Sequence, residues 1–427
     1  MIGETQRPTF REAFAFWFRL GFISFGGPAG QIALLHRETV ERRRWIHDEK
    51  FSRALAFCTF LPGPEAQQLA TWIGWSLHGT RGAITAGVLF VLPASILLLG
   101  LSWMRAAWGA VPLVAAILSG LRPVVAAIIL DAAWSMARRR LNSRAAQIVA
   151  ASALVAALAR APFPAIVAIA GVIGWLMTRA TSPAAAGVLD PDVKASLGWR
   201  RERNLILAGV LLWLAPWPLI VTSNDAPFFQ SLYLFFTQAA FVTFGGAYAV
   251  LSYVTRAAVD HFHWLTRIES LDGLALAETT PGPLIIVLQY VGFLAGWNQA
   301  GCGTSRAWCG ALAAALTTWA TFLPSIWLVL LGACYVERIA TAPRLGGVFR
   351  SVGAAVTGVI AGLGIEYGLS AVWRGSGTAH LIDPVASALL VVALLALRSG
   401  RVPLGVVIAS GALVGGAMSL IGPLLIG

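Results

Sequence analysis

Charged residues are scarce in this chain of 427 residues. They make up 12% of it, about half the share found in soluble domains, whereas hydrophobic residues make up 58%. Such a chain has too little polar surface to fold in water. Charge-free apolar runs close to or above the roughly 20 residues that span a bilayer occur at residues 82–104, 161–178, 307–336 and 402–427. We therefore predict an all-α polytopic membrane protein.

Several familiar sequence features are also missing. No segment alternates like the strand of a membrane barrel, and residues 1–10 show no cleavable signal peptide. The four cysteines have neither the spacing of a zinc site nor that of a disulfide framework. Gly-x-Ser-x-Gly, His-Glu-x-x-His and Gly-Lys-Ser/Thr are absent, which argues against a membrane-embedded enzyme. We expect no catalytic residue, cofactor or metal.

The formal charge of +12 is carried largely by arginines in short segments between apolar runs. Residues in such places commonly set the orientation of a membrane protein. Binding of nucleic acid would require a basic stripe with aromatic residues on a soluble surface, which this sequence lacks. We therefore expect the lipid bilayer as a partner and no nucleic acid.

An internal repeat relates two parts of the chain. Phe-Gly-Gly at residues 25–27 recurs at 244–246, and Pro-Gly-Pro at residues 62–64 recurs at 281–283 with the same offset. Chance recurrence of motifs would not keep one offset. The predicted units are a first repeat at 1–180, a cytoplasmic linker at 181–203, and a second repeat at 204–427 that begins with an extra helix at 204–222.

Basic residues are unevenly divided between the repeats. Residues 36–53 and 138–144 are rich in arginine, whereas their counterparts at 255–272 and 365–373 have few or none. The positive-inside rule then puts the first two in the cytoplasm and their counterparts outside, so the repeats are inverted. The chain must cross the membrane an even number of times between two cytoplasmic segments. Three apolar stretches nevertheless separate residues 36–53 from residues 138–144. We predict that the Pro-Gly-Pro stretch enters the membrane and turns back.

Pro-Gly-Pro inside an apolar run breaks a helix. Broken backbone at membrane depth is tolerated only where protein or a water-filled cavity satisfies its amides. Half-helices that start after Pro28, Pro64, Gly246 and Pro283 would aim N–H groups and positive dipole ends into such a cavity, which suits an anion. The alternative is that these motifs only permit kinks or close helix packing.

Arg122 lies inside an apolar run, and Arg350 occupies the matching place in the second repeat. A charge in the membrane costs about 2.5 to 3.5 kcal/mol on insertion scales. Each arginine should therefore contact substrate, pair with a carboxylate such as Asp131 or Glu366, or reach the interface. The guanidinium fork suits a tetrahedral dianion because it donates two hydrogen bonds at once.

Two carboxylates flank the broken segments. Glu65 follows the first Pro-Gly-Pro and Glu278 precedes the second, where each is either an ordinary helix-end residue or a group whose protonation is coupled to transport. The basic segment near residue 40 either sets orientation alone or also takes part in gating. The predicted coupling or gating residues are Glu65, Glu278, Arg37 and Glu38. The predicted substrate-binding residues are Gly26, Gly27, Pro28, Pro62, Gly63, Pro64, Gln67, Arg122, Gly245, Gly246, Thr279, Thr280, Pro281, Gly282, Pro283 and Arg350.

At these motifs the sequence resembles the chromate ion transporter family in its long, two-domain form. The resemblance covers nearly the whole chain and is carried by residues 25–31, 36–45, 61–75, 244–248 and 278–283. It implies a secondary transporter, expected to be an antiporter, that exports chromate across the bacterial inner membrane and confers chromate resistance. The membrane potential or proton gradient would supply the energy, and sulfate would be the competing analogue. A carrier of sulfate or another oxyanion is the alternative, and a homodimer is left open.

Overall fold

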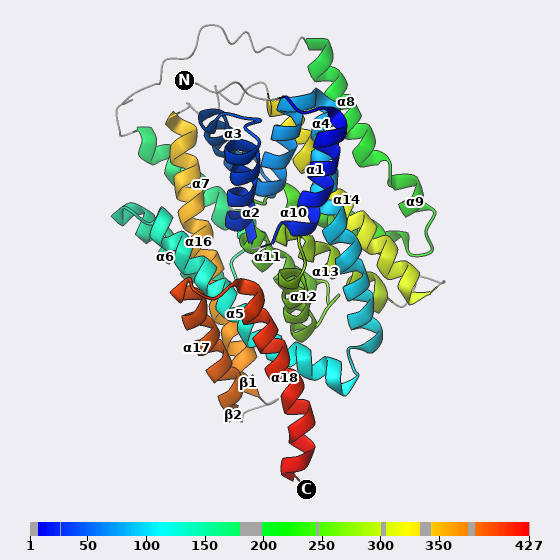
Figure 1. Cartoon of the computed structure of the whole chain (residues 1–427), viewed down its shortest axis with the longest axis vertical. Helices are drawn as coiled ribbons and strands as arrows, with labels where there is room; N and C mark the ends of the chain where they lie inside the picture. Colours follow the sequence, from blue (N-terminus) through cyan, green and yellow to red (C-terminus); the bar gives the residue numbers. More distant parts are fainter. Residues whose placement is uncertain are drawn as a thin grey trace.

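The computed structural model describes residues 7–25, 27–179, 199–244, 247–299, 305–333, 343–374 and 381–426. Almost all of these residues are helical, and one short antiparallel pair joins β1 (Trp373–Arg374) to β2 (Leu381–Ile382) (Figure 1). The helices of the first half are α1 (Phe10–Ile23), α2 (Gly27–His36), η1 (Arg37–Arg42), α3 (Asp48–Phe60), α4 (Glu65–Trp108), α5 (Pro112–Arg140), α6 (Arg144–Leu158) and α7 (Phe163–Arg179). Those that follow are α8 (Trp199–Leu214), α9 (Trp217–Val221), α10 (Ala226–Phe241), α11 (Ala247–Arg256), η2 (Ala257–His261), α12 (Arg267–Thr279), η3 (Leu284–Ile286), α13 (Val287–Asn298), α14 (Arg306–Gly332), α16 (Pro343–Val372), α17 (Pro384–Ser399) and α18 (Leu404–Ile426).

Long apolar helices confirm the predicted all-α polytopic membrane protein. Within the described residues, five segments are long and apolar enough to cross a membrane: Glu65–Trp108, Pro112–Arg140, Trp199–Val221, Arg306–Gly332 and Gly346–Val372. Large apolar side chains face outward along the helices, as lipid-facing positions require.

The backbone repeats its unusual features in both halves. A π-helix directly follows α2 in the first half, as η1, and α11 in the second half, as η2. Arg44 and His263, just after these π-helices, both have positive φ, at 51° and 55°. Gly63 and Gly282, the central residues of the two Pro-Gly-Pro motifs, have φ of 132° and 103°, a region that favours glycine. The sequence repeat therefore corresponds to a repeat in local conformation.

The broken segments of the two halves bind each other. The Gly63 N–H donates to the carbonyl of Thr243 at 2.8 Å, and the Gly282 N–H donates to the carbonyl of Ser24 at 2.9 Å. The exchange is reciprocal, because each Pro-Gly-Pro turn bonds to the residue just before the Phe-Gly-Gly motif of the other half. Backbone groups that the breaks leave unpaired are thereby satisfied away from water.

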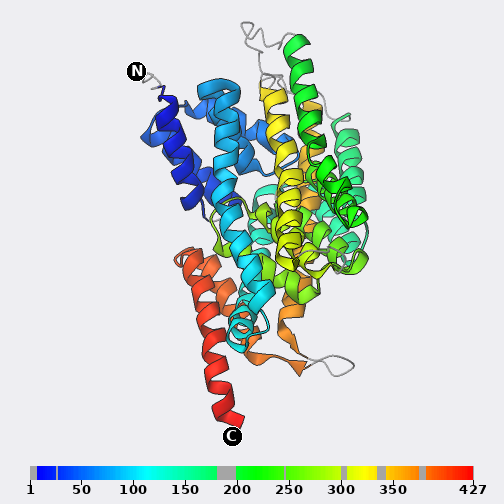
Figure 2. The same ribbon diagram turned by 90° about the vertical axis from the view of Figure 1, so that its right-hand side faces the viewer.

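The helical hairpins of the two halves open toward opposite ends of the molecule. α4 turns back at His78 and Gly79, which have non-helical backbone angles, and a ring nitrogen of His78 lies 3.0 Å from the Pro8 carbonyl at the end where α1 begins. In contrast, Arg267 at the start of α12 binds Glu366 near the end of α16, beside β1 and β2 (Figures 1 and 2). We name these the α1 end and the β end. The chain thus reverses direction at the first Pro-Gly-Pro, between α3 and α4.

Two details differ from the sequence-based expectations. α8 begins at Trp199, inside the predicted linker, and Pro216 separates it from α9, so the predicted extra helix is two helices. Residues 181–198 of the linker lie outside the described residues. Cys58 is free and buried, but Cys309 is disulfide-bonded, a bond that the sequence analysis did not anticipate.

Replacing Gly282 by alanine should destabilise the protein. A Cβ there would clash with the Cβ of Ala94 on α4, and the backbone has φ of +103°. We expect the free energy of unfolding to fall by roughly 1 to 3 kcal/mol, measured by thermal unfolding in detergent. The matched control is Gly100→Ala, because that glycine lies within α4 and no atom lies within 4 Å of the place that the added methyl group would occupy. Equal loss in both variants would contradict the expectation.

Candidate functional site

A cavity of about 430 Å³ lies where the broken helices of the two halves meet. Its walls come from the starts of α2, α4 and α11, from the end of α12, and from one face of α5. Since water occupies about 30 Å³ per molecule, the cavity has room for a small hydrated anion. It draws on both halves and is therefore a shared site.

Three of the four predicted helix starts converge on this central cavity. Gly27 and Pro28 open α2, Glu65 opens α4 and Ala247 opens α11, and all four residues line the cavity. N–H groups at helix starts carry partial positive charge, so three such ends favour an anion.

The fourth predicted start is not at the cavity. Leu284–Ile286 forms the 3-10 helix η3, which is buried and does not line the central cavity. The amide of Gln31 instead packs against this turn, donating to the carbonyls of Gly282 and Ser24. The expectation of four converging helix ends is therefore wrong for the second Pro-Gly-Pro turn, which a side chain fills.

Charged side chains of both signs line the central cavity. Glu65, Asp131 and Glu278 contribute carboxyl groups, and Arg139 and Arg140 contribute guanidinium groups. A nitrogen of Arg140 lies 4.0 Å from Glu65, and the Tyr248 hydroxyl donates to Glu278 at 2.7 Å. The arginines can bind an oxyanion through charge-assisted hydrogen bonds, whereas the carboxylates repel it unless they are protonated.

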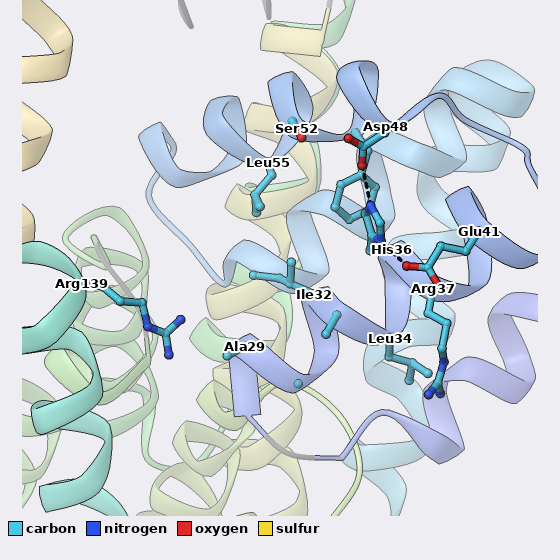
Figure 3. Close-up of a pocket in the computed structure, with 13 residues that line it drawn as sticks. Ala29, Ile32, Leu34, His36, Arg37, Glu41, Asp48, Ser52, Leu55 and Arg139 are labelled. Atoms are coloured by element: carbon cyan, nitrogen blue, oxygen red, sulfur yellow. Dashed lines mark hydrogen bonds and ion pairs between the residues drawn. The ribbon is translucent and has the colours of Figure 1, made fainter. Parts of the chain in front are cut away.

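A second cavity, of about 740 Å³, lies next to the central cavity on the side of the α1 end. The two share Ala29, Ile32 and Arg139 as lining residues. Figure 3 shows Arg139 reaching from α5 toward Ala29 and Ile32 on α2. On the far side, His36 bridges Glu41 at 3.2 Å and Asp48 at 2.6 Å. We call this the entrance cavity.

Of the four predicted coupling or gating residues, Glu65 and Glu278 line the central cavity, whereas Arg37 and Glu38 do not. Arg37 is exposed and lines the entrance cavity. Glu38 is buried at 8% exposure and forms ion pairs with Arg42 at 2.7 Å and Arg43 at 3.8 Å. The carboxylate of Glu38 thus holds Arg42 and Arg43 in place at the end of η1.

Arg122 and Arg350 lie away from the central cavity. Arg122 donates to buried Asp272 from Nε at 2.8 Å and from Nη2 at 3.3 Å, so its partner is neither Asp131 nor Glu366. Glu366 is instead bound by Arg256 and Arg267. Arg350 is exposed and its Nε donates to the Gly346 carbonyl at 3.3 Å.

The other predicted residues surround the broken segments without lining the central cavity. Thr279 and Thr280 donate their hydroxyl protons to carbonyls of α12, at 2.7 and 2.8 Å, so these protons are not offered to an anion. Gln67 is fully buried and accepts from the Ser325 hydroxyl at 2.7 Å. Six further predicted residues form the two Pro-Gly-Pro turns: Pro62, Gly63, Pro64, Pro281, Gly282 and Pro283. The predicted residues Gly26, Gly245 and Gly246 lie outside the described residues.

Sequence reasoning missed two arginines of the central cavity. Arg139 and Arg140 belong to a run of basic residues that the sequence analysis interpreted only as an orientation signal. The run ends α5, and a bundled helix end can point inward as well as toward solvent. Their helical spacing from Asp131, two turns earlier on α5, is the signal that could have found them.

Comparison with known proteins identifies the family of the chain. The family model described as "Chromate transporter" matches residues 11–175 and 230–416. A chromate transport protein of Pseudomonas aeruginosa is 31% identical over 362 residues, which are 84% of this chain and 81% of that protein. One of Cupriavidus metallidurans is 29% identical over 359 residues, 83% of this chain and 81% of that protein. No solved structure matches. The chain belongs to the chromate transporter family.

Proposed function

We propose that this protein is a secondary transporter that exports chromate from the cytoplasm across the bacterial inner membrane and so confers chromate resistance. The observation that carries the proposal is the central cavity, in which three helix starts and two arginines surround a space for a small anion. Membership of the chromate transporter family, together with relatives that are named chromate transport proteins, supports chromate as the cargo.

The α1 end faces the cytoplasm in this proposal. Arginines gather there, in the segment around η1 and at the start of α8, as the positive-inside rule requires. The arginines of the β end within the described residues include Arg105, Arg122 and Arg267, and all three are held in ion pairs. The disulfide at Cys309, in the first turn of α14, suits an oxidising compartment outside the cytoplasm.

The two halves act as an inverted repeat in this proposal. Hairpins that open toward opposite ends, joined by reciprocal bonds at their tips, allow one half to move against the other around a fixed site. The entrance cavity adjoins the central cavity on the side of the α1 end, which supports a carrier open to the cytoplasm. Outward release then requires a second arrangement, open at the β end.

Protons enter this transport cycle through the cavity carboxyl groups. A dianion about 5 Å from one ionised carboxylate is repelled by about 6 to 7 kcal/mol at an effective dielectric constant of about 20. Glu65 and Glu278 both line the cavity, so binding of a dianion favours their protonated forms. The proton and the oxyanion therefore bind together, which favours co-transport over antiport, with the membrane potential driving the dianion outward.

The pH dependence of transport tests this coupling. We expect sulfate uptake into everted vesicles to rise as both faces are acidified, because protonated carboxyls admit the dianion. Glu65→Gln and Glu278→Gln mimic the protonated groups and should each weaken that pH dependence while uptake persists. Glu41→Gln, which changes a carboxyl of the entrance cavity, is the matched control and should keep it. Unchanged pH profiles in both cavity variants would refute the coupling.

A carrier whose ordinary cargo is sulfate is the second candidate, because a site made of helix starts and arginines recognises charge and tetrahedral shape. Everted vesicles that receive each labelled oxyanion alone separate the two. Chromate uptake that excess sulfate inhibits is the expected result. Sulfate uptake without chromate uptake would overturn the proposed cargo.

A further inference from the structure

A third cavity, of about 600 Å³, lies at the β end between α5, α12, α16, α17 and α18. We call it the outer cavity. Arg122 of α5 and Arg267 of α12 both line it, with side chains 21% and 35% exposed. One carboxylate also lines it, Asp383, which accepts from the N–H groups of Val385 and Ala386 and caps α17. The outer cavity thus combines two accessible guanidinium groups with a carboxylate that already has donors.

Each of these two arginines shares its carboxylate with another arginine. Asp272, fully buried, binds Arg122 at 2.8 Å and also Arg105 at 2.8 Å. The same pattern recurs at Glu366, which binds Arg267 and also Arg256, the latter at 3.0 Å. Arg267 further approaches Asp260 at 3.7 Å, and Arg160 approaches the same carboxylate at 3.4 Å.

This sharing makes Arg122 and Arg267 replaceable partners. Leaving a buried carboxylate without any cation is strongly destabilising. Asp272 would keep Arg105, and Glu366 would keep Arg256, if the other arginine turned to a ligand. An arginine also has five N–H donors. Arg122 uses its Nε–H and one Nη2–H to bind Asp272, so its other N–H groups can bind a ligand. The outer cavity can therefore offer two guanidinium groups to an anion without leaving a buried charge unpaired.

We propose that the outer cavity is a second binding site for a tetrahedral oxyanion, held by Arg122 and Arg267, on the release side of the transporter. Its assignment to the release side rests on the proposed function. The Arg122–Asp272 ion pair joins α5 to α12, and the Arg267–Glu366 ion pair joins α12 to α16. An anion bound in the outer cavity draws both arginines away from these carboxylates. Binding of the anion at this site thus loosens the ties that close the β end.

Thiol protection in whole cells tests the site without requiring transport. Ser119, exposed on the wall of the outer cavity, is replaced by cysteine in the full-length protein and alkylated with a membrane-impermeant reagent. We expect external sulfate, at ionic strength matched with chloride, to slow this alkylation severalfold. Thr222→Cys, exposed just after the span Trp199–Val221, is the control and should react equally with and without sulfate.

Arginine variants then assign the protection to the proposed ligands. Arg122→Gln and Arg267→Gln, each added to Ser119→Cys, should raise the half-protecting sulfate concentration about tenfold, as expected for loss of one charge-assisted hydrogen bond. Arg267→Lys, which keeps the charge but loses the fork, should give a smaller increase and guards against misfolding of the glutamine variants. Absence of protection, or protection unchanged in both glutamine variants, overturns the site.

A central-cavity variant separates this inference from the proposed function. Arg140→Gln removes a guanidinium that lines the central cavity and not the outer one. Sulfate protection of Ser119→Cys that persists in this variant supports an independent outer site even where chromate export is lost. Protection that disappears together with export would mean that the anion reaches Ser119 only through the central cavity, and the separate site would fall.

Discussion

Replacing Asp272 by alanine is expected to lower the free energy of unfolding by about 3 to 5 kcal/mol. Its side chain is fully buried between Arg105 and Arg122, at 2.8 Å from each. Removal of the carboxylate would leave the guanidinium groups of Arg105 and Arg122, which are 15% and 21% exposed, without the anion that they share. The loss should appear as a lower thermal midpoint of the purified protein in detergent, together with reduced abundance in the membrane.

The control for this effect is Asp260→Ala. That carboxylate also contacts two arginines, Arg160 and Arg267, but its side chain is 35% exposed and the distances are 3.4 and 3.7 Å. Exposed ion pairs contribute about 0 to 1 kcal/mol, so this variant should unfold close to the wild type. If both variants lose the same stability, burial of Asp272 is not the reason for the loss.

The largest effect on transport is expected from Arg140→Gln. Arg140 lines the central cavity and lies 4.0 Å from Glu65, so its guanidinium can move from that carboxylate to an entering oxyanion. Loss of charge-assisted hydrogen bonds worth about 1.5 to 3 kcal/mol corresponds to a fall of roughly 10- to 100-fold in kcat/KM for chromate uptake. Initial rates in everted vesicles, normalised to protein abundance, measure it.

Arg144→Gln provides the comparison, because it removes the same charge from the exposed start of α6, only a few residues along the chain. A general effect of positive charge on orientation or on attraction of anions would reduce uptake in both variants. A specific role of Arg140 predicts a loss in that variant alone. Wild-type kinetics in Arg140→Gln would remove this residue from the binding site.

Much of the architecture follows from local chemistry that a sequence reveals. A proline lacks a backbone donor and a glycine tolerates positive φ, so the two Pro-Gly-Pro turns predict broken helices, and both turns are present. The scarcity of charge predicts the membrane helices in the same way. Both features depend only on residues that are close in sequence, so the sequence is enough to predict them.

The composition of the cavities depends instead on contacts between distant residues. Asp272 meets Arg105 and Arg122 across the two halves, and no periodic pattern links α12 to α4 and α5. The sequence indicated correctly that Arg122 needs a partner, but it could not choose among the carboxylates. The basic run at the end of α5 could not be assigned to solvent or to the cavity for the same reason. Side chains of the last helical turn can reach either one.

The reciprocal bonds between Gly63 and Thr243 and between Gly282 and Ser24 carry a consequence for how the duplicated chain can diverge. A change of shape at one turn also displaces the partner turn of the opposite half, so neither copy can drift at these positions independently. Elsewhere the copies touch different neighbours and are free to differ. The identical Phe-Gly-Gly and Pro-Gly-Pro motifs lie next to or at these two bonds.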